Sequence, residues 1–272
     1  MANEEIRPAM LLIIDAHAHV YRDPPGKHAP WPVERFLELL DQSGVAGGVL
    51  VQPSFLGTNH VELLAALGAA PGRFRAVGVV DDSFTRNEIL PLHEAGVRGI
   101  RLNFFRGAQA DLTSAKWRKV LAIIEQQGWH LELNVRDEDM AGVLLQVCGM
   151  SIPITVDHIG RPDPAMGVNG PGFKALLDAA GRQTIYLKLT APFRSSMKTA
   201  QECVRAWLTT VGPHRALWGS DCPWVDIDSP PAYRHTLSWI DECISEPADK
   251  AAVLGGNART LFEFGEGVPH TS

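Results

Sequence analysis

Two histidines separated by a single residue, His17 and His19, follow an apolar run near the start of the chain. Side chains two positions apart on an extended chain point to the same side, so both imidazoles can face one spot. Such a pair can bind a metal ion or polarise the carbonyl group of a substrate. The pattern is short enough to occur in turns without any function, so its meaning depends on which other residues the fold brings beside it.

Two later segments carry residues that suit hydrolysis. His158 follows one apolar run, and Asp221 follows another, between Trp218 and Trp224. Ester hydrolysis needs a base that takes a proton from water and positive character at the carbonyl oxygen. An unperturbed aspartate, with a pKa of about 3.9, is ionised at neutral pH. Asp221 is therefore the candidate base, and the three histidines are candidates for polarising the carbonyl group.

Arginines at or just after the ends of apolar runs indicate an anionic ligand, because arginine binds carboxylates through paired hydrogen bonds. We predict a small carboxylated substrate held by six residues: Arg101, Arg161, Arg194, Ser54, Asn103 and Arg106. An alternative for Arg101 is a structural ion pair with Glu132 or Asp157. Lys188 has a similar alternative as a buried, paired lysine, since buried lysines are rare without a partner.

The composition indicates a globular protein whose ligand is a small molecule. The chain has 272 residues, of which 45% are hydrophobic and 21% charged, and its net charge is -6. It has no basic run that would bind nucleic acid or an anionic membrane surface. Its apolar stretches end well before the roughly 20 residues of a membrane span, and its acidic start is unlike a signal peptide. We expect a soluble cytoplasmic protein that binds neither nucleic acid nor membrane, and the sequence predicts no particular oligomeric state.

Short apolar runs that alternate with helical patterns must position the candidate residues. Eight runs are predicted to be buried strands, at residues 11–15, 48–52, 75–80, 99–103, 130–135, 154–157, 185–189 and 216–218. Helical patterns follow at residues 32–43, 60–70, 85–94, 114–127, 137–148, 172–180, 199–211 and 233–244. Gly255 and Gly256 are interpreted as a stop or turn between two closing helices at 249–254 and 257–264.

Eight strand–helix units in roughly 250 residues predict a single (β/α)8 TIM barrel. We expect one domain over residues 1–272, with flexible termini at 1–9 and 265–272. A barrel builds its chemistry at the carboxyl ends of its strands, and the candidate residues fall at those ends. The proline-rich loop at residues 24–31 could cover this mouth, with His28 or Tyr21 touching substrate, although a plain connecting loop is the favoured interpretation.

Six segments together resemble the amidohydrolase superfamily. They are Ile14-Asp-Ala-His-Ala-His19, Val51-Gln-Pro-Ser54, Gly96-Val-Arg-Gly-Ile-Arg-Leu-Asn103, Val156-Asp-His-Ile-Gly-Arg-Pro162, Leu187-Lys-Leu-Thr-Ala191 and Trp218-Gly-Ser-Asp-Cys-Pro-Trp224. The Asp-His-Ile-Gly-Arg-Pro segment and the arginines resemble the lactonase branch that contains 2-pyrone-4,6-dicarboxylate hydrolase. The resemblance implies a hydrolase that opens a cyclic ester.

The resemblance also implies roles for individual residues. The family's first-strand histidines match His17 and His19, its sixth-strand histidine matches His158, and its final aspartate matches Asp221. Positions that hold a dicarboxylate substrate in this branch match three arginines: Arg161, Arg194 and Arg101. The loop that carries Arg106 is shorter than the family's equivalent, so the register of that contact is less certain.

The metal content is a separate question. Binuclear members of the superfamily carry a bridging lysine or carboxylate on strand four and a histidine on strand five. Arg101, Asn103 and Glu132 stand there in this chain, so we expect no binuclear centre. A single zinc or manganese ion could be held by residues chosen from His17, His19, Glu132, His158 and Asp221. We favour hydrolysis that requires no metal, as the resemblance to the pyrone-dicarboxylate hydrolases implies.

These observations predict a lactonase in which Asp221 activates water for attack on a 2-pyrone-4,6-dicarboxylate-like lactone. Alternatives within the superfamily are a zinc-dependent sugar-acid or muconolactone lactonase and a decarboxylase. A non-enzymatic alternative is a barrel that only binds a carboxylated metabolite. Such a protein would be stabilised by its ligand without turning it over.

Overall fold

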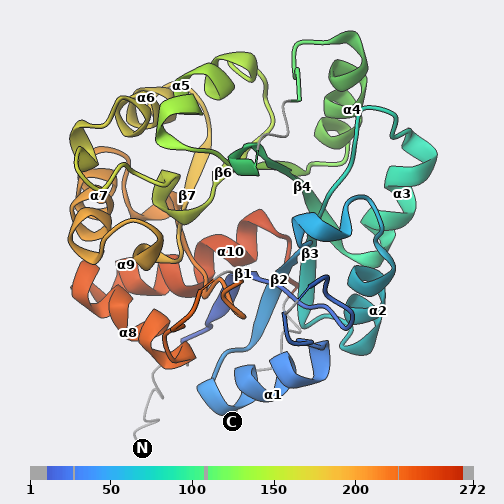
Figure 1. Ribbon diagram of the computed structural model, residues 1–272, viewed down its shortest axis with the longest axis horizontal. Helices are drawn as coiled ribbons and strands as arrows, with labels where there is room; N and C mark the ends of the chain where they lie inside the picture. Colours follow the sequence, from blue (N-terminus) through green and yellow to red (C-terminus); the bar gives the residue numbers. More distant parts are fainter. Residues whose placement is uncertain (1–10, 27, 107–109, 226, 266–272) are drawn as a thin grey trace, which may run out of the picture.

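Eight parallel strands, paired in chain order, form the centre of the computed structural model (Figure 1). The structure describes residues 11–26, 28–106, 110–225 and 227–265. The strands are β1 (Ile14–Ala18), β2 (Gly47–Val51), β3 (Phe74–Gly78), β4 (Val97–Asn103), β5 (His130–Asn134), β6 (Ile154–Val156), β7 (Ile185–Leu189) and β8 (Ala216–Trp218). Of the termini predicted to be flexible, 1–9 and 265–272, residues 1–9 and 266–272 lie outside the described residues, and Gly265 is exposed.

The two edges of this sheet meet just beyond β8. The amide of Asp221 donates to the carbonyl oxygen of His17 at 2.8 Å, and the amide of His19 donates to that of Cys222 at 2.8 Å. These bonds join the first strand to the segment after the last one, so the sheet curls into a barrel. The predicted (β/α)8 barrel is confirmed.

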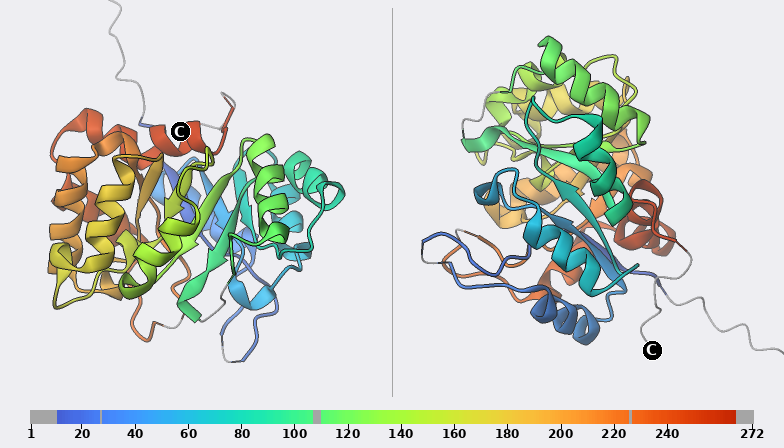
Figure 2. Two further views of the ribbon diagram at one scale, coloured as in Figure 1. Left: turned by 90° about the horizontal axis from the view of Figure 1, so that it is seen from above. Right: turned by 90° about the vertical axis from the view of Figure 1, so that its right-hand side faces the viewer.

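Helices surround the outside of the barrel (Figure 2). They are α1 (Val33–Ser43), α2 (Val61–Ala69), α3 (Arg86–Ala95), α4 (Ala115–Gln126), α5 (Asp137–Gln146), α6 (Pro171–Ala180), α7 (Met197–Thr210), α8 (Tyr233–Cys243), α9 (Pro247–Ala251) and α10 (Asn257–Leu261). Helix α1 is typical: it buries Val33, Phe36 and Leu40, which helical spacing places on one face. Among the described residues, no helix is both long and apolar enough to cross a membrane.

Two predicted boundaries differ from the structure. Strand β1 starts at Ile14 and continues through His17, so this histidine lies inside the strand and not after it. Gly255 and Gly256 do not stop a helix, because they lie in a π-helical turn (Ala252–Gly256) that joins α9 to α10 without a break. A Cβ atom on Gly255 would lie 1.9 Å from the carbonyl oxygen of Leu12, so glycine here permits close packing of a helix on the start of the barrel.

Candidate functional site

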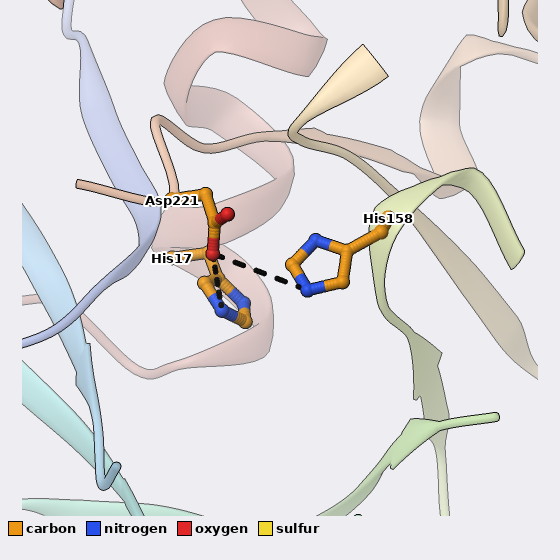
Figure 3. A group of neighbouring side chains, drawn as sticks. All are labelled: His17, His158 and Asp221. Carbon is orange, nitrogen blue, oxygen red and sulfur yellow. Dashed lines mark ion pairs between the residues drawn. The ribbon is translucent and has the colours of Figure 1, made fainter. Parts of the chain in front are cut away.

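Three predicted histidines converge on one carboxylate oxygen of a fourth predicted residue, Asp221. The Nε2 atoms of His17, His19 and His158 lie 3.6, 3.7 and 3.9 Å from Oδ1 of Asp221. Figure 3 shows the imidazoles of His17 and His158 facing the Asp221 carboxylate. All four residues are buried. The structure therefore brings together the candidate base and the three candidate histidines that were selected from the sequence.

Backbone conformation at two of these residues is unusual. His158 has φ of 53° and Asp221 has φ of 61°, a left-handed region that residues other than glycine rarely adopt. Hydrogen bonds hold both: the His158 amide donates to Thr190 Oγ1 at 3.2 Å, and the Asp221 amide donates to the carbonyl of His17. Such strain is concentrated at functional sites, where the surrounding structure maintains it.

The Asp221 carboxylate is held by a guanidinium on one side. Arg194 donates to Oδ2 through its Nε at 2.9 Å and its Nη2 at 2.7 Å, which leaves Oδ1 toward the histidines. Burial raises the pKa of Asp221, but the facing imidazole of His158 and the paired guanidinium of Arg194 lower this pKa well below its usual range. Asp221 is therefore ionised at neutral pH.

Hydrogen bonds at Nδ1 distinguish the histidines. Nδ1 of His19 lies 2.7 Å from the carbonyl oxygen of Val51, which can only accept, so Nδ1 donates this bond and Nε2 is left to accept. Nδ1 of His158 shares a 2.8 Å hydrogen bond with Thr190 Oγ1.

Burial lowers the pKa of His158 well below its usual range. Burial and the nearby Lys188 lower the pKa of His17. Both rings are therefore neutral near pH 7.

A layer of buried charges lies on the Nδ1 side of the His17 ring. Lys188 Nζ, Asp157 Oδ1 and Glu132 Oε1 lie 3.2, 3.3 and 3.6 Å from Nδ1. Lys188 is fully buried and pairs with Glu132, as its structural alternative predicts. Arg101 donates to Asp157 Oδ2 at 2.9 Å and lies 3.4 Å from Glu132. Arg101 thus makes the ion pairs that its alternative interpretation predicts.

A cavity of about 830 Å³ opens above this layer. His19, His158 and Asp221 line it, together with five of the six predicted substrate-binding residues: Arg101, Arg161, Arg194, Ser54 and Asn103. The side chain of the sixth, Arg106, lies outside the described part of the structure. This volume falls within the range of pockets that hold small molecules.

Arg161 differs from the other two arginines of the cavity because, in the part of the chain that the structure describes, no carboxylate pairs with it. Its Nε donates to Asn134 Oδ1 at 2.8 Å, and its guanidinium carbon lies 4.0 Å from the centre of the Phe105 ring. Burial and the charge of Arg194 lower its pKa to about 10, so it remains cationic at neutral pH. Arg161 is thus the cation best placed to receive an anionic group.

Three residues that support the candidate site were not assigned a role from the sequence. Asn134 and Phe105 orient Arg161, and they lack a signal because neither residue type is specific to binding sites. Asp15 lies fully buried and accepts hydrogen bonds from the Ser220 amide, the Ser220 hydroxyl and Tyr233 at 2.9, 2.6 and 2.9 Å. The signal for Asp15 was available, because a carboxylate inside an apolar strand requires partners.

The loop at residues 24–31 also contributes to the cavity wall. Pro25 and His28 line the cavity, and the His28 ring stacks near Phe55 with 6.5 Å between ring centres. Tyr21 is anchored at the base of this loop by two backbone hydrogen bonds to Trp31, at 2.8 and 2.7 Å. The loop therefore faces the cavity as well as connecting two elements.

The donor atoms of His17, His158 and Asp221 lie within 4.8 Å of one another. Imidazole nitrogens and a carboxylate oxygen are ligands that zinc uses, and Nε2 of His17 has no hydrogen-bond partner among the described residues, so residue type and spacing fit a single divalent ion. Glu132 faces the opposite side of the His17 ring. Its carboxylate and that of Asp157 are already paired with Lys188 and Arg101, which leaves that second group poorly suited to a cation.

Relatives of known name share this architecture. The chain is 28% identical to 2-pyrone-4,6-dicarboxylate hydrolase of Comamonas testosteroni, over 77% of this chain and 76% of that protein. It is 27% identical to 4-sulfomuconolactone hydrolase of Rhizobium radiobacter, over 91% of this chain and 89% of that protein.

Solved structures are similar as well. A Pseudomonas putida protein named as a candidate 2-pyrone-4,6-dicarboxylic acid hydrolase is 32% identical, with a TM-score of 0.88 over 93% of this chain and 98% of that one. An Acinetobacter baumannii protein of similar name, solved with citric acid bound, is 29% identical, with a TM-score of 0.85 over 93% and 99% of the two chains. The model of the amidohydrolase family matches residues 14–264. This match spans the whole barrel and all four residues that converge at Asp221 Oδ1, and the chain belongs to the amidohydrolase family.

Proposed function

We propose that this protein is a lactonase that opens a carboxylated cyclic ester resembling 2-pyrone-4,6-dicarboxylate. The observation that carries the proposal is the convergence of three imidazole Nε2 atoms on Oδ1 of an ionised aspartate, at the floor of a cavity walled by arginines. The named relatives with 27 and 28% identity, which are hydrolases of lactones bearing acidic groups, support the same reaction class.

Asp221 is the base in this proposal. Arg194 fixes Oδ2, so Oδ1 takes the proton from a water molecule seated between it and the histidines. The water oxygen attacks the ester carbonyl carbon and forms a tetrahedral intermediate. The bond to the ring oxygen then breaks, the ring oxygen receives the proton that Asp221 took from water, and the former ester carbonyl becomes a new carboxyl group.

The histidines supply the polarisation. A neutral imidazole that donates an N–H bond to the carbonyl oxygen stabilises the negative charge that develops there, and it does so in a buried site where such bonds are strong. His19 has its Nε2 free to accept, so this atom suits the second proton of the attacking water. A divalent ion held by His17, His158 and Asp221 would act as a Lewis acid on the same carbonyl group.

The substrate is expected to be anionic because of the arginine wall. Arg161 carries a positive charge that no described carboxylate balances, and it can hold a substrate carboxylate through paired hydrogen bonds. The Acinetobacter baumannii relative was solved with citric acid, a polycarboxylate, which fits a pocket of this kind. Ser54 and Asn103 line the same wall and offer hydroxyl and amide groups for further hydrogen bonds.

The test is loss of the ultraviolet absorbance of 2-pyrone-4,6-dicarboxylate on incubation with the purified protein, with and without a strong chelator. We expect loss of the chromophore in both conditions. 4-Sulfomuconolactone and sugar-acid lactones are assayed beside it to define the substrate. If the protein binds these lactones but turns none of them over, even with zinc or manganese added, the proposed lactonase activity is contradicted. The protein would then be a barrel that only binds a carboxylated ligand.

A further inference from the structure

Lys188 is a buried cation that the proposed reaction does not use. Its side chain is fully buried at the centre of the barrel, with Nζ paired to Glu132 and 3.2 Å from Nδ1 of His17. We propose that Lys188 is a positioning residue that fixes the proton of His17 on Nε2, which makes this imidazole a hydrogen-bond donor to substrate and a poor ligand for a metal ion. The catalytic meaning of this assignment rests on the proposed lactonase.

The direction of the hydrogen bond follows from the chemistry of lysine. An ammonium group has three donors and no acceptor, and the Glu132 carboxylate beside Lys188 is a partner for such a donor. Nδ1 of His17 must therefore accept. A neutral imidazole carries one proton, so that proton is placed on Nε2, the atom that faces Asp221 Oδ1 at 3.6 Å.

Two carboxylates compete with Lys188 for Nδ1. Asp157 Oδ1 lies at 3.3 Å and Glu132 Oε1 at 3.6 Å, close enough to accept from a protonated Nδ1 if the angle were suitable. Lys188 Nζ is the nearest of these three atoms to Nδ1 and lies in hydrogen-bond geometry toward it. The other oxygen of each carboxylate is engaged, by Arg101 and by Lys188. The geometry therefore favours the lysine.

His17 and His19 are consequently in opposite states although they are two residues apart. His19 donates from Nδ1 to a carbonyl oxygen, which leaves its Nε2 to accept. His17 accepts at Nδ1 from a cation, which leaves its Nε2 to donate. One ring can accept a hydrogen bond from the attacking water while the other donates a hydrogen bond to the oxyanion. Nε2 of His17 has no partner among the described residues, so a substrate oxygen would satisfy this buried donor.

The same arrangement disfavours a metal ion. A histidine that binds a metal through one nitrogen normally donates its other N–H to a carboxylate, carbonyl or water. Binding through Nε2 of His17 would place a proton on Nδ1, where it would face the ammonium donor of Lys188 at 3.2 Å. Residue types and spacing thus fit a divalent ion, while the hydrogen-bond state of His17 opposes one.

The first experiment is nitrogen-15 NMR of the imidazole rings at pH 7, with the His17 signals assigned by their absence from a His17→Gln spectrum. We expect Nε2 of His17 to be protonated and Nδ1 to be unprotonated in the natural protein. A proton on Nδ1 would overturn the assignment. Neither the NMR spectrum nor the metal titration below requires a substrate, so failure of the lactonase assay and failure of this inference are distinguishable.

The second experiment compares Glu132→Gln with the double variant Lys188→Met/Glu132→Gln. Both variants lack the carboxylate at position 132, and only the double variant also lacks the ammonium group of Lys188. In the double variant we expect the His17 proton to move to Nδ1, with Asp157 as acceptor. Zinc, titrated alone by calorimetry, should bind the double variant about ten- to a hundredfold more tightly than Glu132→Gln, because orienting partners change metal affinity by about this much.

Equal zinc affinity of the two variants would overturn the metal part of the inference. Thermal unfolding of each variant establishes that both are folded. If the double variant does not fold, the spectrum of the natural protein still shows which nitrogen of His17 carries the proton. The zinc affinity of Lys188→Gln is then compared with that of Glu132→Gln instead, and this comparison tests whether Lys188 opposes metal binding.

Discussion

The two oxygens of Asp221 have different environments. Oδ2 accepts both hydrogen bonds from Arg194, whereas Oδ1 faces three imidazoles. The guanidinium therefore both orients the carboxylate and keeps it ionised. In the proposed reaction, this pairing holds the base in one orientation, while the lowered pKa makes it a weaker base.

Replacing Asp221 by Asn should abolish turnover and preserve binding. The amide has nearly the shape of the carboxylate but cannot take a proton, so we expect kcat to fall by about 10³-fold or more, a loss typical of removing a general base. Substrate affinity, measured by calorimetry, should change far less. Turnover at the natural rate would eliminate Asp221 as the base.

Arg161 should govern substrate binding. Arg161→Ala removes the unpaired cation of the wall, and a hydrogen bond to a charged group contributes about 1.5–3 kcal/mol, so KM should rise roughly 10- to 100-fold with a smaller change in kcat. Arg161→Lys keeps the charge but loses the paired hydrogen bonds, so its KM should lie between those of the natural protein and Arg161→Ala. Unchanged KM in both variants would show that the anionic group binds elsewhere.

Stability should decrease on acidification, beginning near pH 6.5. His17 and His158 have lowered pKa values in the folded protein, so below pH 6.5 the unfolded chain binds more protons than the folded one and unfolding becomes easier. Each such group contributes up to about 1.4 kcal/mol per pH unit. Asp221 and Asp157 also have lowered pKa values, so their contribution is present above about pH 4 and is lost as pH falls further.

Urea unfolding between pH 7 and 5 measures this dependence. The variant His158→Gln, which cannot take up the proton, should show a smaller slope of unfolding free energy against pH than the natural protein. An equal slope in the two would mean that His158 is not held neutral by the fold.

At the scale of elements, Asp15 connects β1 to the segment after β8 and to α8. Its carboxylate accepts from the Ser220 amide and hydroxyl, from Tyr233 and from the amide of His17 at 3.1 Å. Burial raises the pKa of Asp15 in spite of these bonds. His17 follows Asp15 by two residues, and Asp221 directly follows Ser220, which donates to Asp15, so the geometry of the candidate site depends on this carboxylate.

Asp15→Ala should destabilise the protein by about 3 kcal/mol or more, because it leaves several buried donors without an acceptor. Tyr233→Phe is the matched control, since it removes only one of these bonds and should cost about 1 kcal/mol. Guanidinium unfolding at pH 7 measures both. Similar losses for the two variants would show that the Asp15 carboxylate is not a shared anchor.

The elements were predictable to different degrees. Buried parallel strands are short continuous apolar runs, and each of the eight was found within a few residues. The end of β1 was misplaced because Asp15 and His17 are polar, although both face buried partners. The π-helical turn through Gly255 was missed because two adjacent glycines usually end a helix, and nothing local shows that the backbone of Leu12 packs against them.

The candidate site was predictable in its residues and less so in its contacts. His17, His158 and Asp221 could be selected because parallel strands carry polar residues to one end of a barrel. The pairing of Arg194 with Asp221, and of Lys188 with both Glu132 and His17, depends on side-chain directions across the barrel interior. Residue spacing along the chain carries no information about those directions.

At the scale of the whole molecule, the helical segment from α9 to α10 packs against β1 and β8. Gly255→Ala should be strongly destabilising, by about 3 kcal/mol or more, since its Cβ would lie 1.9 Å from backbone at Leu12. Gly256→Ala is the control, because its Cβ would meet its nearest atom at 3.4 Å and a helical glycine gains stability from alanine. Thermal unfolding should separate the two, and equal midpoints would contradict this packing.

The hydrogen bond from the Asp221 amide to the His17 carbonyl closes the barrel and also joins the proposed base to the first histidine. These two residues are separated by nearly the full length of the barrel sequence, and contacts between such distant positions are slow to form because the intervening chain must be ordered first. A refolding chain would acquire most of its helical signal while still inactive. Catalysis would then appear only in the last kinetic phase, as a signal that the first and last strands have met.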